Sequence, residues 1–358
     1  MKSIPIQNLY YLLCYAWDHL EERDEIEVAD DGNTELAELF ARVLVHGTQR
    51  LLKRGFYRDY HELQEETPRL RGRMEFTPSV RQLSWLKGRM VCAYTELSYD
   101  TLPNRILKAA LRCLMEANGL KDRSKSLWAE LATLYDHLRE VSDIRITGRD
   151  FSRVQLHGNL RSYRFILRVC ELVHYAILPS DGSGTRRFRD FSRDERMAAL
   201  FEAFVRNFYQ RESPEFAAGR SNPVWQELEA LDPAGMSHFP RMQTDIELRR
   251  GTRHIILDCK YYLNALSEHH DRQKFHSTNL YQIYAYLQNL QLMHPGRAFE
   301  GILLYPETGE SFCHRYTLQG HGLTLCTLNL NQPWPGIARD LKALLAEFPQ
   351  QLPGSSSK

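Results

Sequence analysis

Three things are scarce or absent in this sequence of 358 residues: paired cysteines, long apolar runs and an excess of charge of one sign. The seven cysteines are odd in number and none stand in a Cys-x-x-Cys spacing, so neither a disulfide framework nor a cysteine zinc site is indicated. No apolar run reaches the ~18 residues of a membrane-spanning helix. We therefore expect a cytoplasmic protein with reduced thiols and no membrane partner.

The formal net charge is +1, from 46 Lys and Arg against 45 Asp and Glu, which is less basic than is usual for a protein that binds nucleic acid. This small total hides an uneven distribution. Residues 21–40 hold nine acids and one Arg, whereas residues 141–200 hold eleven Arg, no Lys and seven acids. Arg forms forked hydrogen bonds to phosphates and carboxylates, so the second stretch is a candidate binding surface. A solvated charged face is the simpler alternative.

Apolar periodicity and turn signals divide the chain into two domains. An α+β domain that mixes helices with short strands is expected over residues 1–180. A linker rich in Gly and Ser is expected at residues 179–185. The second domain is expected over residues 186–352, and residues 353–358 are expected to form a flexible tail.

The second domain is predicted to follow the order helix, strands, helix, strand, as in an α/β domain. Apolar stripes predict a helix over residues 194–211 and a longer helix over residues 278–293. The strands are expected at residues 224–231, 242–249, 254–261, 301–305, 312–318 and 323–330.

Two acids and a lysine come together on the hairpin formed by the second and third of these strands. Side chains alternate along a strand, so Asp258 and Lys260 point to one face, which Asp245 on the neighbouring strand can join. Two carboxylates at the end of a buried strand are costly unless a cation lies between them, and Mg²⁺ is the natural candidate. Such an ion can activate a water and neutralise charge on a phosphodiester. Lys260 would orient or deprotonate that water, or stabilise the pentacovalent phosphorane.

The same spacing of Asp245, Asp258 and Lys260 also fits a structural ion-pair cluster, and the residues alone leave both alternatives open.

Gln282 and Tyr286 lie one helical turn apart on the following helix, so their shared face can line a groove beside the acids. Residues 268–271, with His276, suggest a second metal site but have no known ligand spacing. His254 is expected to be a surface residue of the hairpin rather than a ligand.

The order of the acids and Lys260, followed by Gln282-x-x-x-Tyr286, resembles the PD-(D/E)XK nuclease superfamily, with Thr244 where the name-giving proline is expected. The whole chain is more specifically similar to the McrC family, the nuclease subunits of McrBC modification-dependent restriction systems. The resemblance implies a PD-(D/E)XK fold for the second domain, with a mixed central sheet flanked by helices. The matching stretches keep the family's order and are residues 8–17, 72–76, 100–105, 240–246, 258–262 and 274–282.

The resemblance also implies roles for individual residues. Asp245, Asp258 and Lys260 match the family's catalytic triad, and the two aspartates are expected to bind Mg²⁺. Glu202, on the first helix of the second domain, matches a glutamate that assists metal binding in related nucleases; a surface position beside an apolar stripe is the alternative. The Gln and Tyr of the later helix are expected to support the triad or to contact DNA.

Partners follow from the resemblance as well. In the McrC family the motor is a separate AAA+ GTPase of the McrB type, a hexameric ring that binds the GTP and recognises double-stranded DNA with modified cytosine. The lack of a Gly-x-x-x-x-Gly-Lys-Ser/Thr loop in this sequence fits that division. The N-terminal domain is expected to bind the ring and stimulate its GTPase, with Arg71 and Arg73 as candidates. Two complexes are expected to pair through this subunit.

The function expected from these features is a Mg²⁺-dependent DNA endonuclease subunit of a restriction system for phage defence. Two alternatives stay open. A non-catalytic adaptor would only activate an AAA+ ring, but a retired site has little reason to keep Asp245, Asp258 and Lys260 together. A free-standing DNA repair nuclease would cut plasmid with Mg²⁺ alone, without a partner or GTP.

Overall fold

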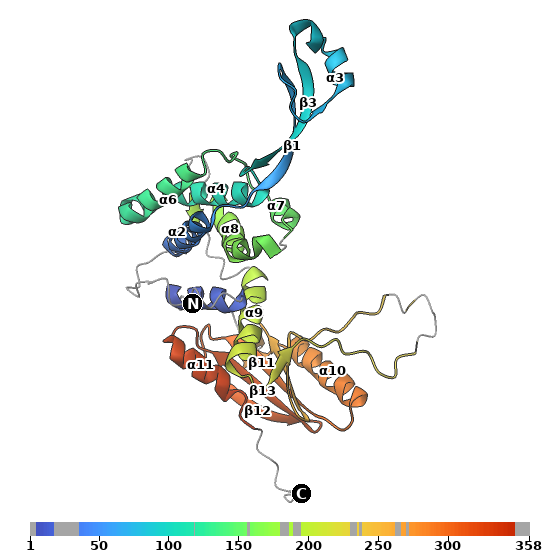
Figure 1. Cartoon of the computed structure of the whole chain (residues 1–358). Helices are drawn as coiled ribbons and strands as arrows, with labels where there is room; N and C mark the ends of the chain where they lie inside the picture. Colours follow the sequence, from blue (N-terminus) through green and yellow to red (C-terminus); the bar gives the residue numbers. More distant parts are fainter. Residues whose placement is uncertain are drawn as a thin grey trace, which may run out of the picture. The chain divides into compact units, whose positions relative to one another are not determined.

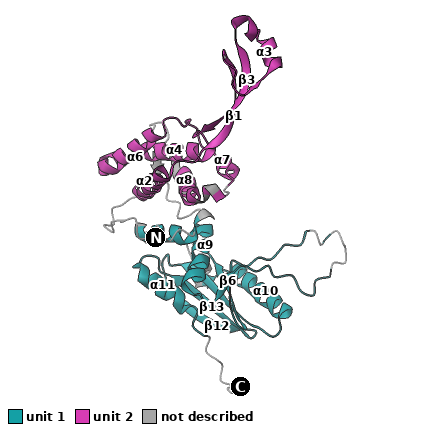
Figure 2. Cartoon of the chain, in the orientation of Figure 1, with its two compact units in different colours: residues 1–34, 190–358 teal, residues 35–189 magenta. Residues whose placement is uncertain are grey.

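The computed structural model of the chain forms two compact units, which Figure 2 shows in separate colours. Unit 1 contains residues 1–34 and 190–358, and unit 2 contains residues 35–189. Within the part of the chain that the structure describes, no helix is both long and apolar enough to cross a membrane. The described residues are 5–17, 36–117, 119–155, 158–179, 186–188, 195–229, 235, 238–261, 266–269 and 272–347.

Unit 1 is built on a mixed six-stranded sheet of order β12-β13-β11-β8-β7-β6. Strand β11 runs parallel to both β8 and β13, and the other neighbours are antiparallel. This confirms the predicted mixed sheet. The strands are β6 (Ala217–Gly219), β7 (Ile246–Arg250), β8 (Arg253–Cys259), β11 (Ala298–Pro306), β12 (Cys313–Leu318) and β13 (His321–Leu328).

Helices flank this sheet, as Figure 1 shows. On α10, Ile283 and Leu287 pack against Ile256 of β8 in a buried apolar cluster, so α10 covers the sheet face that carries Ile256. Helix α9 packs against β7 and β8, and the Tyr209 hydroxyl donates to the Leu341 carbonyl of α11 at 2.8 Å. These helices are α9 (Glu195–Glu212), α10 (Ser277–Met293) and α11 (Trp334–Ala343).

The first helix, α1 (Ile6–Ala16), also belongs to unit 1. Asn8 is buried and donates from Nδ2 to two backbone carbonyls that follow β13, at 2.8 and 2.7 Å. Tyr15 stacks on Trp334 with ring centroids 5.0 Å apart. The expected domain of residues 1–180 is therefore wrong for its first helix, because the buried contacts of α1 are made with the unit that carries the sheet.

Two strand predictions need correction. Residues 224–229 contain no strand, although one was expected over residues 224–231. The backbone N–H of Gln226 instead donates to Asn289 Oδ1 at 2.7 Å, and the short β6 forms the sheet edge. Strand β7 begins at Ile246 rather than at residue 242, so Asp245 stands just before the strand.

The expectation of reduced thiols is wrong for one pair of cysteines. Cys313 and Cys326 stand opposite each other on the antiparallel strands β12 and β13, with their Cα atoms 4.1 Å apart, and form a disulfide. Strand register brings them together, which spacing along the sequence did not reveal. The linker expected at residues 179–185 lies mostly outside the described residues, as does the tail at residues 353–358.

Unit 2 has a body of helices packed through their apolar faces. Helix α4 contacts α2, α6 and α8, and Ile106, Leu107 and Leu111 on α4 are fully buried. A short ladder joins β4 (Ile177–Pro179) to β5 (Arg186–Phe188). The helices and 3₁₀ turn of the body are α2 (Leu36–Arg54), α4 (Leu102–Met115), α5 (Leu120–Arg123), α6 (Lys125–His137), α7 (Gly148–Arg153), η3 (Gly158–Tyr163) and α8 (Arg164–Ala176).

A long hairpin, here called the arm (residues 59–98), projects from this body in Figure 1. Strand β3 lies between β1 and β2 and is antiparallel to both. Gly72 enters β2 with φ +68°, and a Cβ there would lie 2.4 Å from the Ala93 carbonyl oxygen, so glycine is required. The elements of the arm are β1 (Asp59–Thr67), β2 (Arg73–Met74), α3 (Phe76–Arg81), η2 (Ser84–Lys87) and β3 (Met90–Ser98).

Buried polar groups fix the place where the arm joins the body. Asn104 is fully buried, and its Nδ2 donates to the carbonyl oxygens of Tyr57 and Tyr99 at 2.8 and 2.7 Å. Its Oδ1 accepts a hydrogen bond from the Tyr163 hydroxyl at 2.7 Å. The matching stretch 100–105 of the sequence is therefore a structural junction.

The Asp100 carboxylate completes this junction. It accepts hydrogen bonds from Nε and Nη2 of Arg105, at 2.7 and 2.8 Å, and from Oγ of Ser142, at 2.6 Å. Arg105 above all, with Ser142, holds the pKa of Asp100 below its ordinary value. A carboxylate whose pKa is lower in the folded state stabilises the fold above its unfolded pKa and loses that contribution as the pH falls.

We predict that Asp100→Asn lowers the free energy of unfolding by about 1–3 kcal/mol near neutral pH, because Asn keeps the shape but not the charge. The difference from the wild type should shrink as the pH falls below about 4, where the wild-type carboxylate is increasingly protonated as well. Urea unfolding over a pH series measures both effects. A difference that stays constant with pH would contradict the ionic role of Asp100.

Candidate active site

The three residues of the predicted triad lie together at the end of β8. Asp258 is on β8 and Lys260 directly follows that strand. Asp245 directly precedes β7, and the antiparallel pairing of β7 with β8 brings it beside the same strand end. There the backbone N–H of Cys259 donates to Asp245 Oδ2 at 2.9 Å.

A chain of contacts holds Lys260. Its Nζ lies 2.7 Å from Asp258 Oδ2 and donates to Gln282 Oε1 at 2.8 Å. Gln282 Nε2 donates to the Tyr286 hydroxyl at 2.8 Å, and that hydroxyl donates to the Gln243 carbonyl at 2.8 Å. The structure thus brings the two predicted α10 residues to the triad, where both act on Lys260; their contact with DNA stays a prediction.

Burial gives the two aspartates unusual electrostatics. The Asp258 side chain is 1% exposed; its Oδ2 is paired with Lys260 Nζ, and its Oδ1 has no hydrogen-bond partner. Burial raises the pKa of Asp258, and Lys260 partly opposes this. Burial first, and then the charge of Asp258, raise the pKa of Asp245 to about 7. When Asp245 and Asp258 are both ionised, the single charge of Lys260 does not balance their two negative charges.

The residues present fit a hard divalent cation. Buried carboxylate oxygens without donors are stabilised by a metal ion, and Mg²⁺ is bound in proteins by one or two carboxylates while it keeps several waters. Across the described residues, no group of three or more His, Cys, Asp or Glu side chains is arranged to hold a metal. Asp245 and Asp258 would therefore be the side-chain ligands, a set too small for a structural zinc site.

Glu202 lies on α9 near the aspartates but is engaged elsewhere. Its Oε1 accepts hydrogen bonds from Arg206, at 2.8 Å, and from Arg220. Its charge still raises the pKa of both Asp245 and Asp258. Metal binding by Glu202 stays a prediction that this geometry does not favour.

Sequence reasoning missed the two arginines beside Glu202. Arg206 stands four residues after Glu202 on one helix, which is an ion-pair spacing that could have been noticed. Arg220 is brought to the site because β6 pairs with β7, and that pairing was not predicted.

Two other predicted features have different outcomes. His254 was expected on the surface, but it is buried on an interior strand, with Nδ1 2.7 Å from Glu247 Oε1 and its ring against Phe299. The second metal site suggested at residues 268–271 lies largely outside what the structure describes. The backbone there forms β9 (Leu266–His269), which pairs with β10 (Arg272–Phe275).

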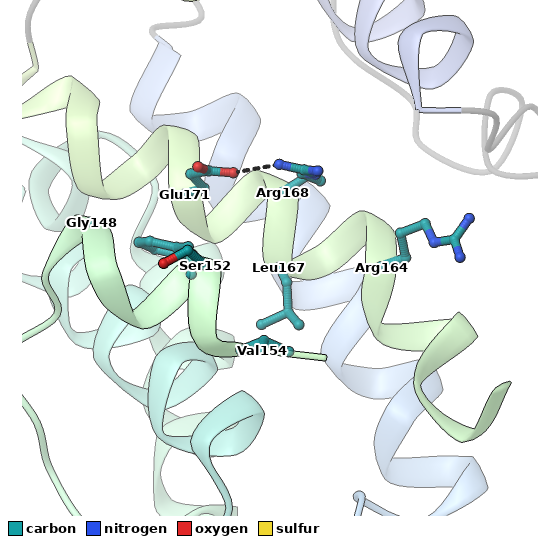
Figure 3. Close-up of a pocket in the computed structure, with 8 residues that line it drawn as sticks. Gly148, Ser152, Val154, Arg164, Leu167, Arg168 and Glu171 are labelled. Atoms are coloured by element: carbon teal, nitrogen blue, oxygen red, sulfur yellow. Dashed lines mark hydrogen bonds and ion pairs between the residues drawn. The ribbon is translucent and has the colours of Figure 1, made fainter. Parts of the chain in front are cut away.

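A hollow of about 350 Å³ lies between α7 and α8 of unit 2 (Figure 3). Phe151, Val154 and Leu167 line it together with Arg164 and Arg168, within the arginine-rich stretch of the sequence. The acid that lines it, Glu171, lies 3.0 Å from Arg168 in an ion pair. This hollow has no pair of facing carboxylates, so the residues at the end of β8 are the better candidate for chemistry.

Comparisons with known proteins identify the family of the chain. A family model described as McrBC 5-methylcytosine restriction system component matches residues 5–306. The type IV methyl-directed restriction enzyme EcoKMcrBC of Escherichia coli (strain K12) is 33% identical over 346 residues, which cover 96% of this chain and 98% of that protein.

Solved structures are similar as well. A refined half-complex from a tetradecameric assembly of Thermococcus gammatolerans McrB AAA+ hexamers with bound McrC matches 95% of this chain and 76% of its own, with a TM-score of 0.53 and 18% identity. At that identity the match shows a shared fold. The cryo-EM structure of the Thermococcus gammatolerans McrBC complex matches 58% of this chain and 59% of its own, with a TM-score of 0.42 and 22% identity.

The raised pKa of Asp245 predicts how stability depends on pH without metal. A group whose folded pKa exceeds its unfolded value destabilises the fold as the pH rises between the two values, here from about 4 to about 7. Asp245→Asn keeps an acceptor for the Cys259 N–H and removes the charge. The free energy of unfolding of Asp245→Asn should therefore rise by about 1–3 kcal/mol relative to the wild type across this range. Urea unfolding with EDTA at both ends of the range measures the gain, and a gap that does not grow with pH would refute the assignment.

Proposed function

The chain belongs to the family of McrBC 5-methylcytosine restriction system components, and from this premise we propose that it is the Mg²⁺-dependent endonuclease subunit of a GTP-dependent restriction complex. Its substrate is double-stranded DNA that carries modified cytosine. The observation that carries the proposal is the cluster of Asp245, Asp258 and Lys260 at the end of β8, in which the buried Asp258 Oδ1 has no hydrogen-bond partner. The relative from Escherichia coli is a methyl-directed restriction enzyme.

The chain's own residues divide the work of phosphodiester hydrolysis. Asp245 and Asp258 would hold Mg²⁺, and that ion would supply activation of water and neutralisation of charge on the phosphate. Lys260 carries a positive charge because it forms an ion pair with Asp258, and Gln282 directs its Nζ. An ammonium in this place orients the attacking water and stabilises the phosphorane.

We predict that Asp258→Ala and the isosteric Asp258→Asn abolish DNA cleavage by the complex while stimulation of the partner's GTPase remains. Either change removes the buried charge that a cation requires. Glu215→Gln, an exposed acid in the turn after α9, is the matched control and should cleave like the wild type.

Plasmid cleavage and GTP turnover, assayed in parallel, measure this prediction. Cleavage by Asp258→Asn with Mg²⁺ present would overturn the site. Robust cutting by the purified wild-type chain alone would favour the free-standing nuclease instead.

The arm is the part of unit 2 best suited to bind the AAA+ partner. Five large apolar side chains at its end are 60–72% exposed, which is unusual for side chains with no partner to cover them. A chain that lacks a phosphate-binding loop needs another subunit for GTP. The half-complex described above contains McrB AAA+ hexamers with bound McrC, which supports a hexameric partner for this chain and the pairing of two complexes. The five exposed apolar side chains at the end of the arm are those of Leu70, Phe76, Val80, Trp85 and Leu86.

Arg71 and Arg73 remain candidates for stimulating the GTPase. Both lie on the arm near this apolar end. Arg71 stacks over the Tyr94 ring at 4.1 Å, and Arg73 lies 2.6 Å from Glu75. These contacts are exposed, so a partner can displace them at low cost.

We predict that the double change Phe76→Ser with Trp85→Ser lowers stimulation of the partner's GTPase at least about tenfold, the loss expected for two exposed aromatic anchors of an interface. Leu292→Ser, at an exposed position of α10 in unit 1, is the control. GTP turnover against subunit concentration measures the effect. Unchanged stimulation by the double variant would exclude the end of the arm as the binding surface.

A further inference from the structure

Two arginines beside the carboxylates have no role in the chemistry above. Arg206 lies one helical turn after Glu202 on α9, and Arg220 directly follows β6. Arg206 Nη1 donates to Glu202 Oε1 at 2.8 Å, and Arg220 Nη2 donates to the same oxygen. One carboxylate oxygen therefore organises two guanidinium groups at the edge of the site.

The backbone fixes Arg220 close to Asp245. The N–H of Ser221 donates to Thr244 Oγ1 at 2.9 Å, and the N–H of Thr244 donates to the Ser221 carbonyl at 2.9 Å. Because Ser221 follows Arg220 and Thr244 precedes Asp245, this doubly bonded pair brings the backbone of Arg220 near that of Asp245. The charge of Glu202, which holds Arg220, also acts on Asp245.

Exposure separates the roles of the two arginines. The side chains of Arg206 and Glu202 are 19% and 20% exposed, so they form a half-buried base. The side chain of Arg220 is 44% exposed. A guanidinium has five N–H donors, so the bond to Glu202 leaves Arg220 with donors for a further acceptor from solvent.

A cationic group at this place would favour substrate binding. A DNA phosphate is an anion, so the Arg220 guanidinium would add its attraction to that of Lys260. Forked hydrogen bonding makes arginine well suited to a phosphate.

We propose that Arg220 binds a phosphate of the cleaved DNA strand next to the scissile one, and that Glu202 is the positioning residue that holds Arg220 there rather than a third metal ligand. This inference rests on the proposed nuclease function. It adds a substrate-binding residue to the site and gives Glu202 a role other than the one expected from the sequence.

The test uses the complex assembled with its partner, GTP and modified DNA, at saturating Mg²⁺. Arg220→Gln should raise the KM for DNA about tenfold with little change in kcat, and lower the slope of log KM against log salt by about 0.9. Arg220→Lys should restore the salt slope but only part of the KM, because lysine lacks the fork. Glu202→Gln should also raise the KM for DNA, because Arg220 is then no longer held by a carboxylate. Arg339→Gln, an exposed arginine of α11, is the control and should match the wild type.

A second readout does not depend on cleavage. Calorimetric titration of Mg²⁺ into the purified chain should show binding by Glu202→Gln with at most a few-fold weaker affinity, since only a nearby charge is lost, whereas Asp258→Asn should bind none. A wild-type KM and salt slope in Arg220→Gln would overturn the inference, as would loss of Mg²⁺ affinity in Glu202→Gln. Cleavage by Asp258→Asn would instead defeat the proposed function, so the two failures are distinguishable.

Discussion

The burial of the Asp258 carboxylate is the constraint on which the rest of the candidate active site depends. A charged group taken out of water costs several kcal/mol unless other charges and hydrogen bonds compensate for it. Lys260 is the compensating charge paired with Asp258 Oδ2, and Asp258 Oδ1 has no hydrogen-bond partner. Asp245 shares the strand end, and its own burial, followed by the charge of Asp258, raises its pKa. Two buried carboxylates beside one lysine explain why a divalent cation fits there.

The surrounding fold maintains this shortage of positive charge. Strand β8 lies between β7 and β11 in the sheet, which keeps water from the carboxylate, and α10 packs on one face through the apolar residues next to Gln282 and Tyr286. The Gln282–Tyr286 contact ends on a backbone carbonyl, so the direction of Lys260 is set by the main chain rather than by a mobile side chain. Glu202, whose charge acts on both aspartates, accepts hydrogen bonds from Arg206 and Arg220. The site is therefore preorganised for a cation and a phosphate.

Much of this arrangement could be predicted from the sequence, and the failures have physical causes. Alternation along strands placed Asp258 and Lys260 on one face, and helical spacing paired Gln282 with Tyr286. The edge strand was misplaced because β6 is three residues long and leaves no periodic signal, so Arg220 was missed. The division of the chain was misjudged because α1 packs on residues more than three hundred positions away, such as Trp334. Contacts of that kind depend on tertiary packing, which local patterns do not encode.

The near-zero net charge is consistent with this arrangement. An acidic stretch at residues 21–40 offsets the arginine-rich stretch at residues 141–200, and DNA affinity supplied mainly by a partner ring would leave no need for a large basic excess. Positive charge at the site itself is local, on Lys260, Arg206 and Arg220. Net charge thus said little about function, whereas the placement of a few charges was informative.

The most direct test of the central claim, that a buried aspartate pair binds a divalent cation, is the number of protons released when Mg²⁺ binds. Calorimetric titrations at about pH 6.5 in buffers of different ionisation enthalpy measure this number, because ligands must be deprotonated to bind a metal. With the pKa of Asp245 raised to about 7, binding should release a substantial fraction of a proton, and the release should fade well above that pH. Binding without proton release, or no binding at all, would contradict the claim.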